Sequence, residues 1–458
     1  NTSHAPAVCF YFQVHQPFRL KDLRFTDIGG GSKPFDDEKN RAIFRKVAEK
    51  CYLPANAVLL QMLDEHPEFH ASFSLSGVFL DQCELYGPDV LASFQALAKT
   101  GRVEFLAETY YHSLSAVASP REFASQVKKH SEKIMALFGM TPKTFRNTEL
   151  IYSNEIAQLA RLMGFETILA EGVDRILDGR QPNVPYAVPR FRLPRHFERA
   201  IATERPLEKR ADEIHVLLKH YRLSDDIAFR FSDSHRSGNP LLAETFASWV
   251  KATGGHSVNL FMDYETFGEH QWADTGIFAF LAALPAAFKR EGMRMRTPSQ
   301  LMAEWKEAGH EAPVYDAHAL TSWADTERDL SAWQGNHIQR SALTAIYALE
   351  DAVKASGDAE LLDTWRKLQT SDHYYYMCTK YWHDGDVHKY FSPYDSPYEA
   401  YRRFSHALED LRHRLRAYEA RSTKHEGNLN TPVSHISNIG GFEDSSFLRA
   451  SNSEIHPS

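Results

Sequence analysis

Along residues 1–290, two kinds of segment alternate, and they differ in how their apolar residues are spaced. Short runs rich in Val, Leu, Ile and Phe are each followed by a segment whose apolar residues recur at helical spacing, as Ile156, Leu159, Ala160 and Met163 do. Strands are predicted at residues 8–15, 70–76, 103–110, 144–149, 167–171, 215–220 and 257–265. Alternation of strands and helices is typical of a parallel α/β sheet, either doubly wound or closed as a barrel.

The pattern changes at two places along the chain. Residues 173–212 are rich in Arg and Pro, and we interpret them as an excursion over one end of a barrel. Beyond residue 290 the strand pattern stops, and helices are predicted at 329–356, 359–381 and 397–421. We therefore expect a catalytic barrel at 1–290 and a helical domain at 291–421. The polar, aperiodic residues 422–458 are expected to form a disordered tail.

Polar or ionisable residues close nearly every predicted strand: His15, Ser76, Glu108, Glu149, Glu171, Lys219 with His220, and Asp263. In a parallel barrel all these strand ends face one mouth, which is where barrel active sites lie. Strand ends are also polar because they meet water, and this accounts for some of the seven. It accounts poorly for a carboxylate that directly follows an apolar run, as Asp263 does.

Two stretches concentrate the candidate chemistry, residues 145–152 and 261–272. Each is an apolar, β-favouring run that delivers a carboxylate, Glu149 or Asp263, and continues with aromatic and polar residues. Hydrolysis of a glycosidic bond commonly uses two carboxyl groups that face each other across the bond. We therefore take Glu149 and Asp263 as a candidate catalytic pair.

The charge of the chain argues against two classes of partner. A net charge of −8 and a pI near 6.3 argue against nucleic acid or an anionic membrane as the main partner. The four cysteines are far apart in sequence and are expected to be free thiols, which suits a reducing compartment. No apolar run approaches the roughly 18 residues of a membrane span, and residues 1–7 do not resemble a signal peptide, so we expect a cytoplasmic protein.

On several motifs the chain resembles glycoside hydrolase family 57, and within it the α-amylase group. The resemblance covers about residues 8–415, and the motifs that carry it are His15-Gln16-Pro17, Gly101-Arg102-Val103-Glu104 with Tyr111-His112, Arg146-Asn147-Thr148-Glu149, Asp263-Tyr264-Glu265, Gly268-Glu269-His270, Ser322-Trp323-Ala324-Asp325 and Trp333-Gln334-Gly335-Asn336.

The resemblance implies an incomplete (β/α)7 barrel with parallel strands, followed by a helical region. It implies cleavage of α-glucan linkages with retention of configuration, with no cofactor and no obligatory metal. Glu149 is then the nucleophile and Asp263 the general acid/base, with carboxyl groups about 5–5.5 Å apart. The residues expected to bind the sugar are His15, Glu108, His112, Glu265, His270, Trp272, Trp323, Asp325 and Trp333.

Three alternatives stay open at this point. The first is a 4-α-glucanotransferase or branching enzyme of the same family, which would transfer the glycosyl group to a sugar in place of water. The second is a metal-dependent deacetylase or mannosidase, in which His15, His112 and Asp263 would ligate zinc. The third is a glucan-binding protein without turnover.

Overall fold

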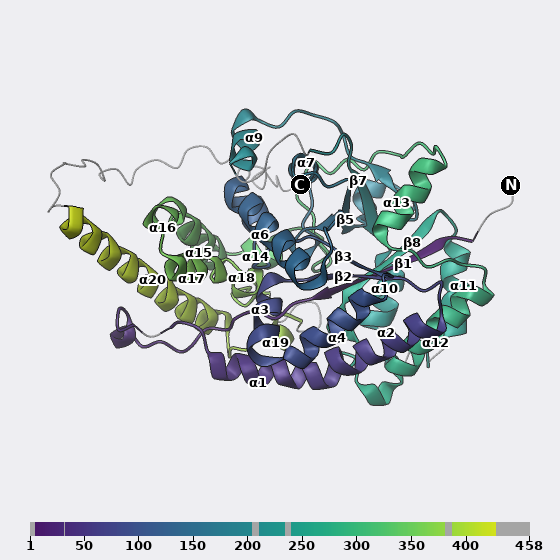
Figure 1. Ribbon diagram of the computed structural model, residues 1–458, viewed down its shortest axis with the longest axis horizontal. Helices are drawn as coiled ribbons and strands as arrows, with labels where there is room; N and C mark the ends of the chain where they lie inside the picture. Colours follow the sequence, from purple (N-terminus) through teal and green to yellow (C-terminus); the bar gives the residue numbers. More distant parts are fainter. Residues whose placement is uncertain (1–4, 32, 204–209, 234–239, 381–386, 427–458) are drawn as a thin grey trace, which may run out of the picture. The chain divides into compact units, whose positions relative to one another are not determined.

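The computed structural model of the chain (Figure 1) describes residues 5–31, 33–203, 210–233, 240–380 and 387–426. These residues fall into two compact units. The first consists of the described residues up to Phe18, Asp37–Ser113 and Pro120–Leu330. The second consists of Arg19–Asp36, Leu114–Ser119 and the described residues from Ser331 onward. The first unit therefore extends past the boundary expected at residue 290, and it excludes two segments of the expected barrel.

The first unit is built on parallel strands in two sheets. The order in one sheet is β3-β2-β1-β8, and in the other it is β4-β5-β7-β6, where the short β6 runs antiparallel to β7. The strand bounds are β1 (Ala7–Val14), β2 (Ala71–Leu75), β3 (Val103–Phe105), β4 (Thr144–Arg146), β5 (Thr167–Glu171), β6 (Tyr186–Ala187), β7 (His215–Lys219) and β8 (Ser257–Asp263).

Backbone contacts join the two sheets at both edges. At one seam a parallel bridge pairs Ala107, just beyond β3, with Phe145 of β4. At the other seam the His220 amide donates to the Asn259 carbonyl (2.9 Å), and the Asn259 side chain donates to the Leu218 carbonyl (2.9 Å). Within the described residues, seven parallel strands therefore close an incomplete (β/α)7 barrel, which confirms the predicted fold class.

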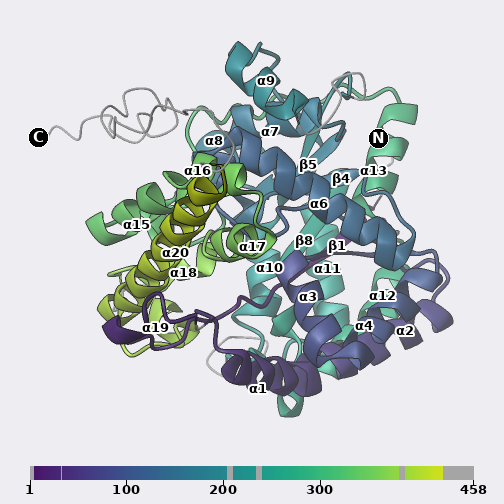
Figure 2. The same cartoon turned by 60° about the vertical axis from the view of Figure 1, so that its left-hand side comes forward.

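Helices enclose this barrel on the outside, and Figures 1 and 2 show α2, α4 and α12 side by side. Their bounds are α1 (Asp37–Val47), α2 (Leu53–Glu65), α3 (Gly77–Tyr86), α4 (Pro88–Lys99), α6 (Pro120–Phe138), α7 (Asn154–Leu162), α10 (Tyr221–Ala228), α11 (Ala243–Thr253), α12 (Ile277–Arg290) and α13 (Pro298–Glu307).

The alternation within each strand separates two apolar cores. Phe10 and Phe12 of β1 belong to the core between the strands and the outer helices. Cys9 and Tyr11 of the same strand belong to a smaller core with Leu169 and other residues of the barrel interior. Because successive side chains of a strand point to opposite faces, both faces of β1 are buried.

Most predicted strands agree with the structure to within two residues, but two are shorter than expected. The strand expected at 103–110 ends at Phe105, and the one expected at 144–149 ends at Arg146. Beyond them the backbone adopts positive φ at His112 (49°), Glu149 (57°) and Leu150 (50°). Such residues cannot continue a strand, so Glu108 and Glu149 lie on loops that follow the strands.

The excursion expected at 173–212 contains regular structure in its described part. It holds α8 (Asp174–Leu177), the short strand β6 and α9 (Arg195–Ala202). Residues 204–209 lie outside the described residues.

Helices dominate the second unit, as predicted for this part of the chain. The long predicted segments are divided into shorter helices: α14 (Ser331–Gln334), α15 (His337–Tyr347), α16 (Glu350–Ser356), α17 (Ala359–Lys367), α18 (Ser371–Tyr375) and α19 (Val387–Phe391), with α5 (Ser115–Ala118) from the earlier segment. Helix α20 (Pro397–Glu426) is longer than expected and includes the first residues of the expected tail. From residue 427 that tail lies outside the described residues.

The segment Arg19–Asp36 is tied to α20 within the second unit. The Gly29 amide donates to Asp410 Oδ1 (2.9 Å), and His406 Nδ1 lies 2.6 Å from the Leu23 carbonyl. These contacts explain why residues far from the C-terminus belong to the helical unit.

Among the described residues, none of the helices combines the length and the apolar character that a membrane span requires.

Candidate active site

Inward-facing polar side chains gather at the C-terminal ends of the barrel strands. In the ladder between β1 and β8, Gln13 is level with Asp263, and between β5 and β7, Glu171 is level with Lys219. Since all these strands are parallel, their ends open on one side of the barrel. The structure therefore brings these four residues to a common mouth, whereas His220, which was expected there beside Lys219, lines a separate cavity.

Glu149 is fixed at this mouth by two hydrogen bonds to its carboxylate. His112 Nε2 lies 3.2 Å from Oε1, and Trp323 Nε1 donates to Oε2 at 2.8 Å. The Trp323 backbone amide also donates to the Glu149 carbonyl (3.3 Å), so Trp323 contacts this residue twice. The Glu149 backbone is left-handed, with φ 57° and ψ 25°. Strained backbone of this kind is common at active sites, where the surrounding contacts maintain it.

His112 bridges Glu149 to a second, fully buried carboxylate. Its Nδ1 lies 2.9 Å from Glu108 Oε2, and Glu108 also accepts hydrogen bonds from Ser74 (3.0 Å) and Gln13 (3.2 Å). Burial opposes the charge of His112, but its hydrogen bonds to both carboxylates raise its pKa to about 9. Burial likewise opposes ionisation of Glu108, yet the hydrogen bond and charge of His112 lower its pKa to about 2. At neutral pH His112 is therefore an imidazolium that donates to two carboxylates.

His15, which directly follows β1, packs against this imidazolium. The two rings are stacked, with centroids 4.0 Å apart, and His15 Nδ1 lies 2.7 Å from Ser76 Oγ. The predicted group of His15, Glu108 and His112 is therefore contiguous, and it lies beside Glu149.

Asp263 ends β8 in a different electrostatic setting. Partial burial raises the pKa of its carboxyl, and the charge of Glu149 raises it further, to about 6, against the opposing charges of Arg146, Lys219 and His112. Among the described residues Asp263 makes no capping hydrogen bond to the turn that follows it. Two carboxyl groups in unlike environments, one of them with a raised pKa, are the arrangement that acid/base chemistry requires.

The turn after Asp263 carries three further predicted residues. Tyr52 donates a 2.5 Å hydrogen bond to Glu265, and burial together with the charge of Asp263 raises the pKa of Glu265 to about 8. Burial lowers the pKa of His270 to about 4, so it is neutral at physiological pH. Trp272 is 59% exposed, with Lys50 Nζ 5.2 Å from its ring centroid.

The remaining predicted residues lie in different units. Asp325 lies two residues from Trp323 in the first unit and has positive φ (51°). Trp333 belongs to the second unit, where it is buried and its ring centroid lies 6.1 Å from that of Tyr375. Its expected role in binding the sugar stays a prediction.

A charged cluster beside Trp323 was not assigned a role from the sequence. Lys219 lies 3.6 Å from the buried Glu171 and 3.2 Å from Asp225, and Arg328 lies 3.6 Å from Glu171. Arg175 donates to the carbonyl oxygens of Glu327 (2.9 Å) and Arg328 (3.1 Å). These contacts anchor the loop that presents Trp323 to Glu149. Glu171 and Lys219 were visible as strand ends, but nothing in the sequence showed that Arg328 joins them.

The donor groups of the mouth do not form a metal-binding set in the described part of the chain. No group of three or more His, Cys, Asp or Glu side chains there is arranged to hold a metal ion. Both ring nitrogens of His112, one of the alternative zinc ligands, are hydrogen-bonded to carboxylates.

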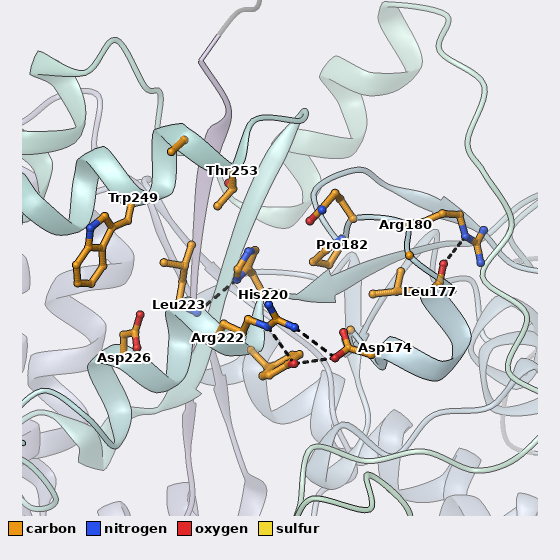
Figure 3. A pocket seen from close by; sticks show the side chains of 15 residues that line it. Asp174, Leu177, Arg180, Pro182, His220, Arg222, Leu223, Asp226, Trp249 and Thr253 are labelled. Atoms are coloured by element: carbon orange, nitrogen blue, oxygen red, sulfur yellow. Dashed lines mark hydrogen bonds and ion pairs between the residues drawn. The ribbon is translucent and has the colours of Figure 1, made fainter. Parts of the chain in front are cut away.

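A separate cavity of about 710 Å³ lies on the same unit (Figure 3). It is lined by residues that include His220, Arg222 and Trp249, and by none of the predicted site residues. The Tyr221 hydroxyl donates a hydrogen bond to Asp174 (2.8 Å) and accepts one from Arg222 (3.1 Å). These polar groups of the cavity wall are therefore hydrogen-bonded to one another.

This chain is similar to proteins of a known family of glycosyl hydrolases. The sequence model of glycosyl hydrolase family 57 matches residues 9–313. A protein of Methanocaldococcus jannaschii, provisionally named an alpha-amylase, is 38% identical over 426 residues, which cover 91% of this chain and 86% of that protein.

Solved structures share the fold at low sequence identity. A family-57-type branching enzyme of Pyrococcus horikoshii is 16% identical, with a TM-score of 0.62 over 91% of this chain and 94% of that chain. A 4-alpha-glucanotransferase of Thermococcus litoralis is 15% identical, with a TM-score of 0.56 over 81% of this chain and 56% of that chain.

Proposed function

The chain belongs to glycosyl hydrolase family 57, and from this premise we propose that it is a retaining hydrolase of α-1,4-glucosidic bonds in starch, glycogen or maltooligosaccharides. One observation carries the proposal. The carboxylate of Glu149 is oriented by His112 and Trp323, and its charge acts on Asp263, whose pKa burial and that charge raise to about 6. The attributed activity of the Methanocaldococcus jannaschii relative agrees with this substrate class.

In the first step Glu149 attacks the anomeric carbon while Asp263 protonates the oxygen of the departing sugar. A bond forms between Glu149 and the sugar, the glycosidic bond breaks, and the proton of Asp263 leaves with the alcohol. Because burial and the charge of Glu149 raise the pKa of Asp263 towards neutral, Asp263 can hold this proton before the reaction begins.

In the second step Asp263 removes a proton from a water molecule, which attacks the anomeric carbon and releases Glu149. The ester formed in the first step carries no charge at Glu149. One cause of the raised pKa of Asp263 is therefore absent at this stage, and the same carboxyl becomes a base. His112 and Trp323 keep their donors directed at Glu149, which stabilises it as a leaving carboxylate.

Glu149→Gln and Asp263→Asn test the assignment. Each variant should lose nearly all hydrolysis of soluble starch while remaining folded, as far-ultraviolet circular dichroism would show, because each replaces a carboxyl by an amide of similar size. The anomer released from a maltooligosaccharide, followed by NMR before mutarotation, should be the α form. Near-normal activity in either variant, or release of the β anomer, contradicts the mechanism.

Transfer to a sugar acceptor is the second candidate. Trp272, which is 59% exposed on the turn that follows Asp263, offers a ring face on which an acceptor sugar can stack. Product sizing after incubation with a single maltooligosaccharide separates the two activities. Products longer than the substrate mean transfer, whereas only shorter products mean hydrolysis.

A further inference from the structure

Arg146 is a buried cation that takes no part in the two proposed chemical steps. It ends β4, where the strand register places it level with Leu169 of β5 in the barrel interior. Its side chain is fully buried, and among the described residues none of its three guanidinium nitrogens has a hydrogen-bond partner. Burying a charge without hydrogen bonds is unfavourable, so its place must be stabilised by other contacts.

Aromatic rings supply those contacts. The Arg146 guanidinium carbon lies 4.9 Å from the centroid of the Trp323 ring and 5.9 Å from that of Tyr11. Trp323 is also approached by Lys219, whose Nζ lies 5.2 Å from the ring centroid. Cations attract the faces of aromatic rings, and more strongly where water is excluded. Two cations therefore hold the indole whose N–H donates to Glu149.

The charge of Arg146 also acts on the carboxyl groups of the mouth. Burial and the charge of Glu149 raise the pKa of Asp263, and Arg146 is the foremost of the charges that oppose this rise. Burial opposes the ionisation of Glu108, which His112 and, more weakly, Arg146 favour.

We propose that Arg146 is a positioning residue for the catalytic pair: its guanidinium holds the Trp323 indole against Glu149 and places a permanent positive charge near the carboxyl group of Asp263. The proposal rests on the proposed function for the roles of Glu149 and Asp263. Arginine suits this position better than lysine, because its guanidinium is planar, stacks on rings and keeps its charge when buried.

Arg146→Met removes the charge and keeps much of the volume. We expect kcat to fall about a hundredfold, as when one preorganised electrostatic contact is lost, with KM changed less than about threefold. The alkaline limb of the pH profile should move to higher pH, because Asp263 would hold its proton more strongly. Arg146→Lys should keep the alkaline limb of the wild type and recover part of kcat, since it restores the charge without the planar contact.

A readout that does not need turnover follows the indole directly. In protein labelled with ¹⁵N at tryptophan, the Trp323 resonance is identified by its loss in Trp323→Phe. Its N–H should exchange with solvent faster in Arg146→Met than in the wild type. This measurement keeps its meaning if the wild-type protein proves inactive on α-glucans, so failure of the proposed function and failure of this inference are distinguishable.

Arg102→Met is a matched control, because it removes a guanidinium that hydrogen-bonds to the His66 carbonyl (2.9 Å) just before β3, at the opposite end of the strands. It should leave kcat and the Trp323 resonance unchanged. Wild-type kcat in Arg146→Met overturns the inference, as does a loss of kcat with an unchanged alkaline limb and unchanged indole exchange. If Arg146→Met does not fold, Arg146→Lys decides: wild-type kcat there, with wild-type indole exchange, is equally fatal.

Discussion

Stability of the barrel should depend on pH through the buried pair of His112 and Glu108, and His112→Gln tests this dependence. Glutamine keeps a polar side chain but cannot carry the charge that His112 places between Glu108 and Glu149, at 2.9 Å and 3.2 Å. Its hydrogen-bonding groups can replace at most part of the two donors.

The size of the effect follows from the pKa of His112. Its two hydrogen bonds to carboxylates, acting against burial, raise this pKa from 6.5 to about 9. At about 1.36 kcal/mol per pKa unit, protonated His112 contributes about 3 kcal/mol to the free energy of unfolding. Because the pKa is higher in the folded state, this contribution is complete below pH 6.5 and is lost as the pH rises through about 9. The lowered pKa of Glu108 describes the same ion pair and is counted once.

Urea denaturation of wild type and His112→Gln over this range of pH measures the difference. The variant should be less stable by about 3 kcal/mol near pH 6, and the gap should shrink towards zero by about pH 10. His130→Gln is the matched control. His130 is buried on α6, where its ring nitrogens contact the Leu75 carbonyl (2.7 Å) and the Glu108 amide (3.3 Å), and burial lowers its pKa. His130 is therefore neutral at the pH values of this experiment above its pKa. The difference in the free energy of unfolding between the wild type and His130→Gln should not shrink at high pH. A gap for His112→Gln that is constant or grows with pH refutes the ion pair.

Three further predictions concern the turn after Asp263. Glu265→Gln should keep wild-type activity at neutral pH and retain more of it above pH 8, because burial and the charge of Asp263 raise the pKa of Glu265 to about 8 and the native carboxyl is protonated below that value; a fall at neutral pH contradicts this. Trp272→Ala should raise KM for maltooligosaccharides and leave the melting temperature unchanged, since the ring is 59% exposed; an unchanged KM removes Trp272 from the substrate cleft. Gly268→Ala should lower the melting temperature strongly, because φ is 110° and a Cβ atom would lie 1.9 Å from the Lys50 carbonyl oxygen. Gly276→Ala should lower it much less, because Gly276 has φ 84° but open space around its Cβ position. Equal losses of melting temperature argue against the clash.

Much of the fold was predictable because strand and helix periods differ so clearly in this chain. The alternation in β1 places Phe10 and Phe12 outside the barrel and Tyr11 inside it, and that periodicity is visible in the sequence. The positions of Asp263 at the end of one predicted strand and of Glu149 at the end of another also predicted that they share one mouth. The short strands β3 and β4 were overestimated, because nothing local marks where a backbone turns to positive φ without glycine.

The supports of Glu149 were less predictable, because they come from distant parts of the chain. Trp323 follows Glu149 by 174 positions, and the sequence predicted that it binds the sugar but gave no sign that its N–H is bonded to the carboxylate. Arg146 stands three residues before Glu149, and its position on β4 was the only signal that it faces inward. The lack of a hydrogen-bond partner for its guanidinium among the described residues, and its contact with the Trp323 ring, depend on packing that the sequence does not encode locally.

Because the backbone around Glu149 is strained, the contacts that His112 and Trp323 make with it depend on one another. Positive φ at His112, Glu149 and Leu150 costs about 1–3 kcal/mol at each residue. The buried ion pair of His112 and the paired hydrogen bonds of Trp323 exist only when the loops adopt this conformation, and they offset a comparable free energy. Loss of either partner should therefore relax the loop and move the carboxylate, in addition to removing one hydrogen bond. His112→Gln combined with Trp323→Phe should consequently cost less stability than the sum of the single variants, since the second change acts on a loop that has already relaxed.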